Sequence, residues 1–373
     1  MRKVLTLPKT RKRNNFETSL PREACLFFGK IILLKTMPKI VEYLKANWQR
    51  VAFVAGLTLI VLSLLLIFVF ASMRQGTMVV EPVLNTNTVA VLPTARVYTD
   101  LYAVSIDNHV DARPVSGVNQ AAIVYEVPVE GNITRYLAFF ERGARVPLIG
   151  PVRSARLYFL DLMTQYGVSF FFHFGGSPEA LAKIDSIASL QQINKDGMGA
   201  GGNLFWRDDK RDAPHNAYTS SDNVHKAFDA RLGASHQTEA WLMAGEPDIA
   251  LRGDDGAKIN LPIDYNPVWV YNKTENIYRR MVKGADEKDR DGATITAKNV
   301  IVLRMDVSVI DEVGRLKVGI AGRGQATVYH NGKTEDATWV AGADNSVPVR
   351  FYAADGSEIV LTNGNVWVEV VKK

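Results

Sequence analysis

The chain has 373 residues, of which 44 are Lys or Arg and 39 are Asp or Glu, so its formal net charge is +5 at pH 7. Residues 1–50 hold twelve of the basic and three of the acidic residues, which leaves 32 and 36 for the rest of the chain. The longer part is therefore mildly acidic, which argues against nucleic acid as its partner. The single cysteine, Cys25, excludes a disulfide in that part.

Residues 51–73 (VAFVAGLTLIVLSLLLIFVFASM) contain no charged side chain. A helix of this length crosses a hydrocarbon core about 30 Å thick, so we predict a single transmembrane helix here. The basic tail over residues 1–50 should stay in the cytoplasm, with the C-terminal domain extracytoplasmic. The apolar run is longer than that of a cleaved signal peptide, and bulky Phe70 occupies the −3 position of the nearest small-residue site. We therefore expect a retained signal anchor in the cell membrane.

Two start positions remain open for the cytoplasmic tail. Residues 1–36 are basic and lack helical periodicity, whereas Met37 opens an amphipathic segment that leads into the apolar run. Either Met37 is the natural start, or the first 36 residues form a genuine basic tail.

An α/β lobe is predicted over residues 101–235, after a Val-, Asn- and Pro-rich linker over residues 74–100. Its expected elements are strands over 102–106, 121–129, 133–141 and 168–174, and helices over 157–166, 178–187 and 221–232. Ser154 is a candidate N-cap of the first helix, and Ser177 with Pro178 fits the start of the second.

Short strands separated by turns dominate residues 236–373, and we expect a β-rich second lobe there, as a small sandwich or barrel-like sheet. The expected strands cover residues 257–263, 268–271, 277–282, 299–306, 315–320, 325–329, 337–340, 347–352, 358–361 and 366–371. Asn331-Gly332 and Asp355-Gly356 are typical of type I′ hairpin turns. The fold class is thus α/β (α+β) followed by a β-rich lobe.

No motif predicts a metal or a cofactor. The six histidines show neither HxxxH nor HxH spacing and have no cysteine partners, so a zinc site would have to be assembled in three dimensions. Nucleotide-binding glycine loops and nucleophile elbows are also missing from the sequence.

Unusual polar residues instead gather at the ends of elements in the first lobe. Arg153 and Arg156 stand at a helix start, where the helix dipole disfavours cations and where, with free N–H groups, they would collect an anion. The alternative is that each arginine pairs with an acid such as Glu126, Glu130 or Asp161.

Two histidines lie where function is often found. His173 ends an apolar strand just before a Gly-Gly-Ser turn, and the carboxyl ends of strands are a usual binding place in α/β sheets. A buried, hydrogen-bonded histidine is the competing interpretation. His215 lies in an irregular loop with Arg211.

Several of these segments resemble the YerB-like lipoprotein family. They are SIDN at residues 105–108, RPVSG at 113–117, IVYEVPVEGNITR at 123–135, IGPVRSAR at 149–156, HFGGS at 173–177, APHN at 213–216, NVIV at 299–302 and GRGQA at 322–326. The resemblance covers nearly all of residues 100–373 and implies a two-part domain of unknown function. Lipoproteins of this kind carry a lipobox cysteine, which this chain lacks, so we expect the transmembrane helix to be the anchor instead.

We expect a binding or scaffolding protein of the cell envelope that recognises an anionic or glycan ligand or a partner protein. The ligand-binding candidates are Arg153, Ser154, Arg156, His173, Gly175, Gly176, Ser177, Arg211, His215 and Asn216, with Asp107, Arg113, Glu126, Glu130 and Arg135 as secondary candidates. The alternative is a cell-wall hydrolase or transferase, with His173 or His215 as general base and an arginine stabilising an oxyanion. Convergence of both histidines on a carboxylate such as Asp107 would favour the enzyme.

Overall fold

This computed structural model describes residues 42, 46–49, 61–63, 65, 92–199, 201–231, 235–342 and 347–373. The predicted cytoplasmic tail, transmembrane helix, linker up to residue 91 and alternative start at Met37 lie outside these residues, apart from the single positions just given. In the described part of the chain, no helix is both long and apolar enough to cross a membrane. Everything below concerns the compact unit that begins at residue 89.

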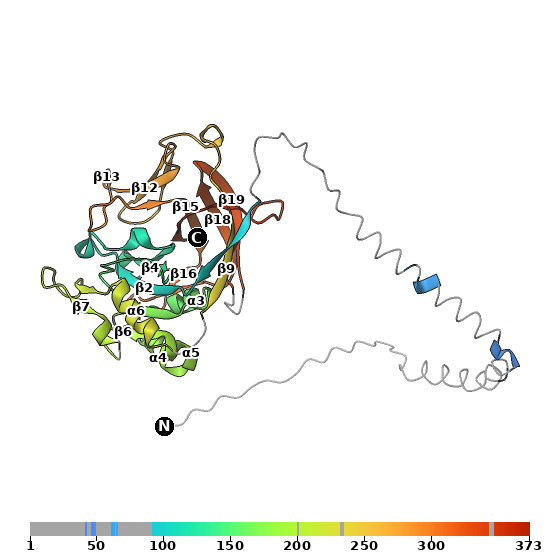
Figure 1. The fold of residues 1–373 in the computed structure, drawn as a ribbon, viewed down its shortest axis with the longest axis horizontal. Helices are drawn as coiled ribbons and strands as arrows, with labels where there is room; N and C mark the ends of the chain where they lie inside the picture. Colours follow the sequence, from blue (N-terminus) through green and yellow to red (C-terminus); the bar gives the residue numbers. More distant parts are fainter. Residues whose placement is uncertain are drawn as a thin grey trace, which may run out of the picture. The chain divides into compact units, whose positions relative to one another are not determined.

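A ten-stranded sheet organises this unit, in the order β20-β19-β18-β15-β22-β3-β4-β2-β5-β6 (Figure 1). The first half of the chain supplies β2 (Tyr102–Asp107), β3 (Ile123–Pro128), β4 (Thr134–Phe140), β5 (Phe170–His173) and β6 (Asn194–Asp196). The second half supplies β15 (Asn299–Met305), β18 (Gly322–His330), β19 (Lys333–Ala341), β20 (Arg350–Tyr352) and β22 (Val366–Lys372). The halves join where β22 runs parallel to β3.

The second half therefore differs from the expected sandwich or barrel. Other strands of this half form a smaller sheet of β10 (Lys258–Asn260), β11 (Val268–Asn272), β12 (Ile277–Val282), β13 (Ala285–Asp286) and β14 (Thr296–Ala297), and a pair of β16 (Val307–Val309) and β17 (Leu316–Val318). The physical reason lies in β22, whose first six residues are all buried, as in a central strand covered on both faces. The alternation of apolar and polar residues identifies strands but does not show which sheet they join.

Part of the predicted linker is also a strand. Residues Thr94–Thr99 form β1, which pairs with β9 (Gln237–Ala244), and β9 pairs with β21 (Leu361–Thr362). Tyr98 of β1 is buried in the core and supplies the apolar contact that holds this short strand. A further two-stranded pair joins β7 (Trp206–Arg207) to β8 (Ala217–Tyr218).

The described helices are α3 (Leu157–Gln165), α4 (Pro178–Ser186), α5 (Ala188–Ile193) and α6 (Ser221–Asp229), with short 3-10 turns η1 (Val110–Ala112), η2 (Val118–Gln120), η3 (Glu130–Asn132), η4 (Gly202–Leu204) and η5 (Ile249–Leu251). The predicted cap of α4 is confirmed, because the Ser177 hydroxyl accepts a hydrogen bond from the Ala180 N–H. The predicted cap of α3 is wrong. Arg156 occupies the N-cap position of α3, and the Ser154 hydroxyl donates to the Phe174 carbonyl instead.

The two predicted hairpin turns differ from each other. Asn331 and Gly332, between β18 and β19, both have positive φ, at 51° and 70°, as a type I′ turn requires. In the second turn Gly356 has a φ of 86° but Asp355 does not share the positive φ, so the type I′ prediction is wrong there.

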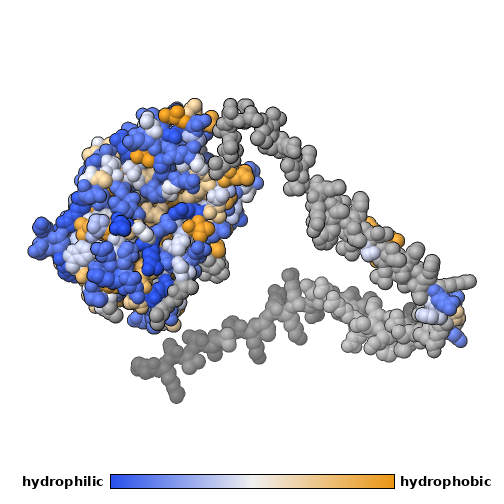
Figure 2. All heavy atoms as spheres, viewed as in Figure 1, coloured by the Kyte–Doolittle hydropathy of each residue, from blue (hydrophilic) through white to orange (hydrophobic). Residues whose placement is uncertain are grey.

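Both faces of the large sheet are buried. On β4, Leu137 and Phe139 pack with helix α3, whereas Ala138 and Phe140 pack on the other side with α6 and residues of the smaller sheet. Figure 2 shows that hydrophobic residues on the visible face of the domain are scattered among hydrophilic ones. The apolar side chains that define the fold therefore lie mainly inside.

A buried ionic network links the two halves of the chain across this interior. The Arg280 guanidinium is fully buried and contacts the carboxylates of Glu126 on β3, Glu287 and Glu369 on β22. Its Nη1 lies 2.7 Å from Glu369 Oε1, and its Nε lies 2.8 Å from Glu287 Oε2. The Tyr265 hydroxyl donates to Glu126 and completes the network.

This network holds more carboxylates than cations. Three carboxylates face Arg280, and the next cation, Arg113, lies 3.8 Å from Glu287. Burial and, after it, the neighbouring Glu126 carboxylate raise the pKa of the Glu369 carboxyl to about 8, against the opposing effect of the Arg280 guanidinium. Glu369 is consequently expected to be protonated in the folded protein at neutral pH.

Glu369→Gln should therefore remove a pH-dependent cost of folding. Between the ordinary glutamate pKa of 4.5 and about 8, the folded chain binds a proton that the unfolded chain has released, so wild-type stability falls as pH rises, by up to about 1.4 kcal/mol per pH unit. Urea unfolding at pH 5, 6.5 and 8 should show the variant gaining stability relative to wild type as pH rises. Exposed Glu312→Gln is the control, and parallel curves for Glu369→Gln and wild type would contradict the assignment.

Candidate functional site

Arg153 and His215 meet on one buried carboxylate at the end of β2. The Asp107 side chain is about 1% exposed, and its Oδ2 lies 3.0 Å from Arg153 Nε and 2.7 Å from His215 Nδ1. Its other oxygen, Oδ1, accepts a hydrogen bond from the His109 backbone N–H at 3.1 Å. Both oxygens of the Asp107 carboxylate thus have partners.

Backbone hydrogen bonds bring these distant segments together. The Asp107 N–H donates to the Pro151 carbonyl and the Arg153 N–H to the Ser105 carbonyl, so residues 150–153 run beside the end of β2. The Val152 N–H donates in turn to the Ala217 carbonyl, which brings the loop that carries His215 to the same place. Backbone pairing between segments far apart in the sequence therefore brings Asp107, Arg153 and His215 together.

Arg135 lies beneath this surface. It sits opposite Asp107 in the β2–β4 register, and its Nη1 donates to the Ser154 carbonyl at 2.9 Å. Burial lowers the pKa of Arg135 to about 10, against the opposing effect of the Asp107 carboxylate. At neutral pH Arg135 still carries its charge, so it adds positive potential below the surface.

His109 and Arg211 complete the surroundings. The His109 ring stacks on the His215 ring, with centroids 4.8 Å apart and planes at 16°. The Arg211 guanidinium donates to the carbonyls of Ala112 and Pro114 and so holds the turn that follows His109. We call Asp107, His109, Arg153 and His215 the Asp107 cluster.

The cluster is open to solvent on its cationic side. The side chains of His215, Arg153 and His109 are 15%, 26% and 35% exposed, while Asp107 is buried behind them. A buried carboxylate that holds a partly exposed guanidinium in place is a pre-organised arrangement for an incoming negative group.

Arg156 does not join this cluster. Its guanidinium forms a two-pronged contact with the Glu130 carboxylate, with Nε 2.9 Å from Oε2, and Nη1 donates to the Ala155 carbonyl. This is the acid-pairing alternative that the sequence left open. Arg156 and Ser177 line a separate, small cavity of about 170 Å³.

His173 is a buried structural residue. Its Nδ1 lies 2.8 Å from the Gly175 carbonyl oxygen and so carries a proton, and its Nε2 contacts the side-chain amide of Asn194. The Gly175 N–H donates to Asp196, and Gly175 has a φ of 68°, which favours glycine. The convergence of both histidines on Asp107 that would favour an enzyme is therefore not found, because both nitrogens of His173 face groups of its own turn and sheet edge.

The other predicted residues serve the scaffold. The Asn216 side chain donates to the Arg211 and Asp208 carbonyls and fixes the loop before β8. Arg113 donates to Asn108, and its guanidinium lies 3.9 Å from the centre of the Tyr265 ring. Gly176 approaches Leu181 closely and packs the turn before α4.

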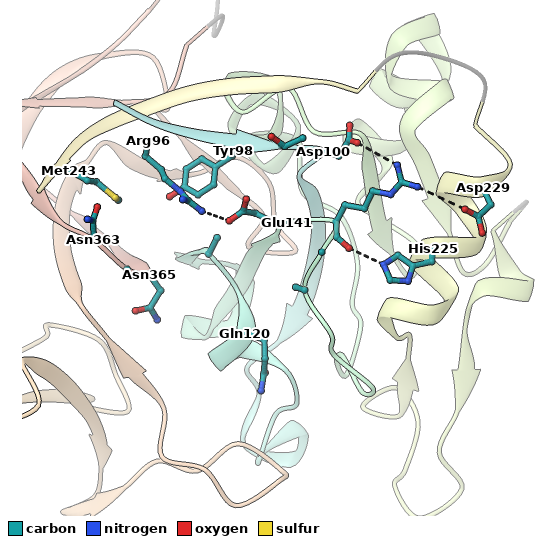
Figure 3. Close-up of a pocket in the computed structure, with 16 residues that line it drawn as sticks. Arg96, Tyr98, Asp100, Gln120, Glu141, His225, Asp229, Met243, Asn363 and Asn365 are labelled. Carbon is teal, nitrogen blue, oxygen red and sulfur yellow. Dashed lines mark hydrogen bonds and ion pairs between the residues drawn. The ribbon is translucent and has the colours of Figure 1, made fainter. Parts of the chain in front are cut away.

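A larger hollow lies elsewhere. A groove of about 1,190 Å³ is lined by residues that include Arg96, Asp100, Glu141, Arg142 and Asp229 (Figure 3). Arg96 pairs with Glu141, and Arg142 lies 3.6 Å from Asp100 and 3.9 Å from Asp229, so the cations of this groove already face carboxylates. No predicted site residue lines it. We place the candidate site at the Asp107 cluster because its cations keep N–H groups free.

The sequence analysis missed His109 and Asp111. The structure places their side chains beside His215, although 106 residues separate His109 from His215 in the sequence. A His-x-Asp spacing directly after a strand was the one available signal, and without the position of His215 it had no specificity.

Comparisons with known proteins identify the family. Residues 89–235 match the family described as "Protein of unknown function (DUF3048) N-terminal domain", and residues 258–368 match its C-terminal domain. "Putative lipoprotein YerB" of Bacillus subtilis (strain 168) is 32% identical over 276 residues, which cover 72% of this chain and 80% of that protein. The chain belongs to the DUF3048 family. The resemblance seen in the sequence is confirmed.

The crystal structure of the YerB protein from Bacillus subtilis superimposes on this DUF3048 chain with a TM-score of 0.62 at 27% identity, and covers 75% of this chain and 92% of that one. The Asp107 cluster lies wholly in the N-terminal DUF3048 domain, whereas Arg280 and Glu287 of the buried network lie in the C-terminal one. The two domains therefore share one core. The candidate site belongs to the N-terminal domain, whereas much of the network behind it belongs to the C-terminal domain.

The Arg156–Glu130 pair predicts a measurable coupling. Arg156→Met and Glu130→Gln, alone and combined, should give a coupling free energy of about 1 kcal/mol in urea unfolding, because the pair is two-pronged and partly buried. Arg156→Met combined with Asp161→Asn is the matched control and should be additive, since Asp161 contacts Lys183. A coupling of zero for the first pair would contradict the structural role.

Proposed function

We propose that this DUF3048 protein is a membrane-anchored, extracytoplasmic binding protein of the cell envelope that recognises an oxyanion, a carboxylate or a phosphate, at the Asp107 cluster. The observation that carries the proposal is the sharing of Asp107 Oδ2 by Arg153 and His215. One carboxylate oxygen holds the Arg153 guanidinium and the His215 imidazole in a fixed relation before any ligand arrives.

The unused donors of the cluster support an oxyanion. Among the described residues, the Nη groups of Arg153 have no hydrogen-bond partner. A guanidinium presents paired N–H groups that suit two oxygens of a carboxylate or phosphate. Buried Arg135 adds positive charge below, so the anion would not have to be balanced by Arg153 alone.

The proposed location rests on the relative and on the N-terminal sequence. The Bacillus subtilis relative is named as a lipoprotein, which is a membrane-associated class of protein. In this chain the uncharged residues 51–73 would replace the lipid, and the basic residues 1–50 would remain in the cytoplasm. The binding domain would then face the cell wall or an envelope partner protein.

An enzyme is the second candidate, because one contact favours it. The 2.7 Å contact between Asp107 and His215 Nδ1 resembles the way a carboxylate orients an imidazole that acts as a general base. In the described part of the chain, however, no hydroxyl or thiol side chain forms a hydrogen bond with His215. A binding site is therefore the simpler use of the cluster.

Oxyanion binding can be measured by calorimetric titration of the chain with sulfate, phosphate and acetate. Arg153→Gln should weaken the preferred anion at least roughly tenfold, because it removes the charged N–H pair. Binding should also weaken as ionic strength rises. Arg211 is left unchanged, because it holds the carbonyls of Ala112 and Pro114.

Arg323→Gln is the control, since this exposed arginine lies on β18, five strands away from β2 in the sheet. It should bind like wild type. Equal affinity of Arg153→Gln and wild type, with both proteins folded, would rule out the proposed site.

A further inference from the structure

Three potential metal ligands meet at the edge of the Asp107 cluster. His109, Asp111 and His215 each offer one ligand atom, and these atoms all lie within 4.8 Å of one another. All three side chains are at least partly exposed, with Asp111 at 69% and His109 at 35%. They can therefore be reached from solvent and have room to adjust.

The spacing of the first two ligands already suits a metal. His109 Nδ1 lies 3.3 Å from Asp111 Oδ2. In a tetrahedral zinc site with bonds of about 2.0–2.1 Å, neighbouring ligand atoms lie roughly 3.3 Å apart. The ligand atom of His215 lies within 4.8 Å of both, and its ring is stacked on that of His109.

The position of Asp107 is an independent observation in favour of a metal. Its carboxylate binds His215 Nδ1 at 2.7 Å and is itself buried, which leaves Nε2 as the coordinating nitrogen. Metal-bound histidines almost always donate their other ring N–H to a carboxylate or carbonyl in this way, which fixes the tautomer and the ring orientation.

We propose that His109, Asp111 and His215 bind a Zn²⁺-type divalent metal ion, that Asp107 orients His215 for it, and that the open position of the ion takes one oxygen of the oxyanion. Two imidazoles and one carboxylate are a ligand set that suits zinc, and three protein ligands leave a coordination position open. The second part of this proposal rests on the proposed function. The first part, metal binding, does not.

The charges that surround this site affect how it would bind a metal ion. Arg153 and buried Arg135 repel a cation, and Asp107 already balances one of them. An oxyanion between the metal and Arg153 would offset the excess positive charge. Metal and oxyanion should therefore bind cooperatively, each raising the affinity of the chain for the other by the same factor.

The test uses the full chain after treatment with EDTA and its removal. Titration with ZnCl₂ alone, and with CoCl₂ followed by visible absorption, should show one equivalent bound with the spectrum of a cobalt ion that has nitrogen and oxygen ligands. His109→Gln and Asp111→Asn should each weaken zinc binding at least roughly tenfold, and Asp107→Asn by about ten- to a hundredfold. Sulfate added to the protein solution before the titration should tighten zinc binding.

His225→Gln is the matched control, because this exposed histidine on α6 contacts the Arg142 carbonyl and none of the three ligands. It should bind zinc like wild type. Substoichiometric zinc, or zinc binding that His109→Gln and Asp111→Asn leave unchanged, would overturn the proposal.

The two proposals fail differently. Arg153-dependent sulfate binding by the EDTA-treated chain, without any zinc binding, would overturn the metal site and leave the oxyanion site intact. Stoichiometric zinc that depends on His109, with no binding of any oxyanion, would support the metal site and remove the proposed function.

Discussion

Burial of Arg280 among three carboxylates is the constraint on which the rest of the structure depends. Charges in an interior are costly to desolvate, so removing Arg280 would leave buried carboxylates without their cation. Because Glu126 lies on β3 and Glu369 at the paired position on β22, the network also specifies the register of the parallel pair that joins the two halves. A shift by one residue would turn one carboxylate to the opposite face of the sheet.

The same network reaches the candidate site through a short chain of hydrogen bonds. The Asn108 amide donates to Glu126 and to Thr134, and its oxygen accepts from Arg113. Asn108 lies between Asp107 and His109, so the backbone that carries the cluster is fixed from behind by the core. The support of the site thus involves both DUF3048 domains, although its own residues come from the first alone.

Local sequence patterns predicted the features that depend on interactions between neighbouring residues. The Ser177–Pro178 start of α4 and the Asn331-Gly332 turn both depend on neighbouring residues, and both are confirmed. The parallel pairing of β22 with β3 depends on segments more than 200 residues apart, and no periodicity in either strand reveals it. For that reason the second half was expected to form a sheet of its own.

For the candidate site, too, the sequence predicted some residues correctly and others not. Arg153 and His215 were singled out by position, and the structure brings them together on Asp107, but Arg156 and His173 satisfy their polar groups within the fold. Sequence alone could not distinguish these cases, since each depends on which acid or carbonyl lies opposite in space. His109 and Asp111 were missed for the same reason.

A crystal structure of the chain grown with sulfate tests the central claim most directly. The account predicts a sulfate within hydrogen-bond distance, about 2.7–3.2 Å, of an Arg153 Nη group, with Asp107 still holding Arg153 and His215 from behind. Sulfate bound only in the groove lined by Arg96 and Arg142, with the Asp107 cluster free of it, would contradict the account.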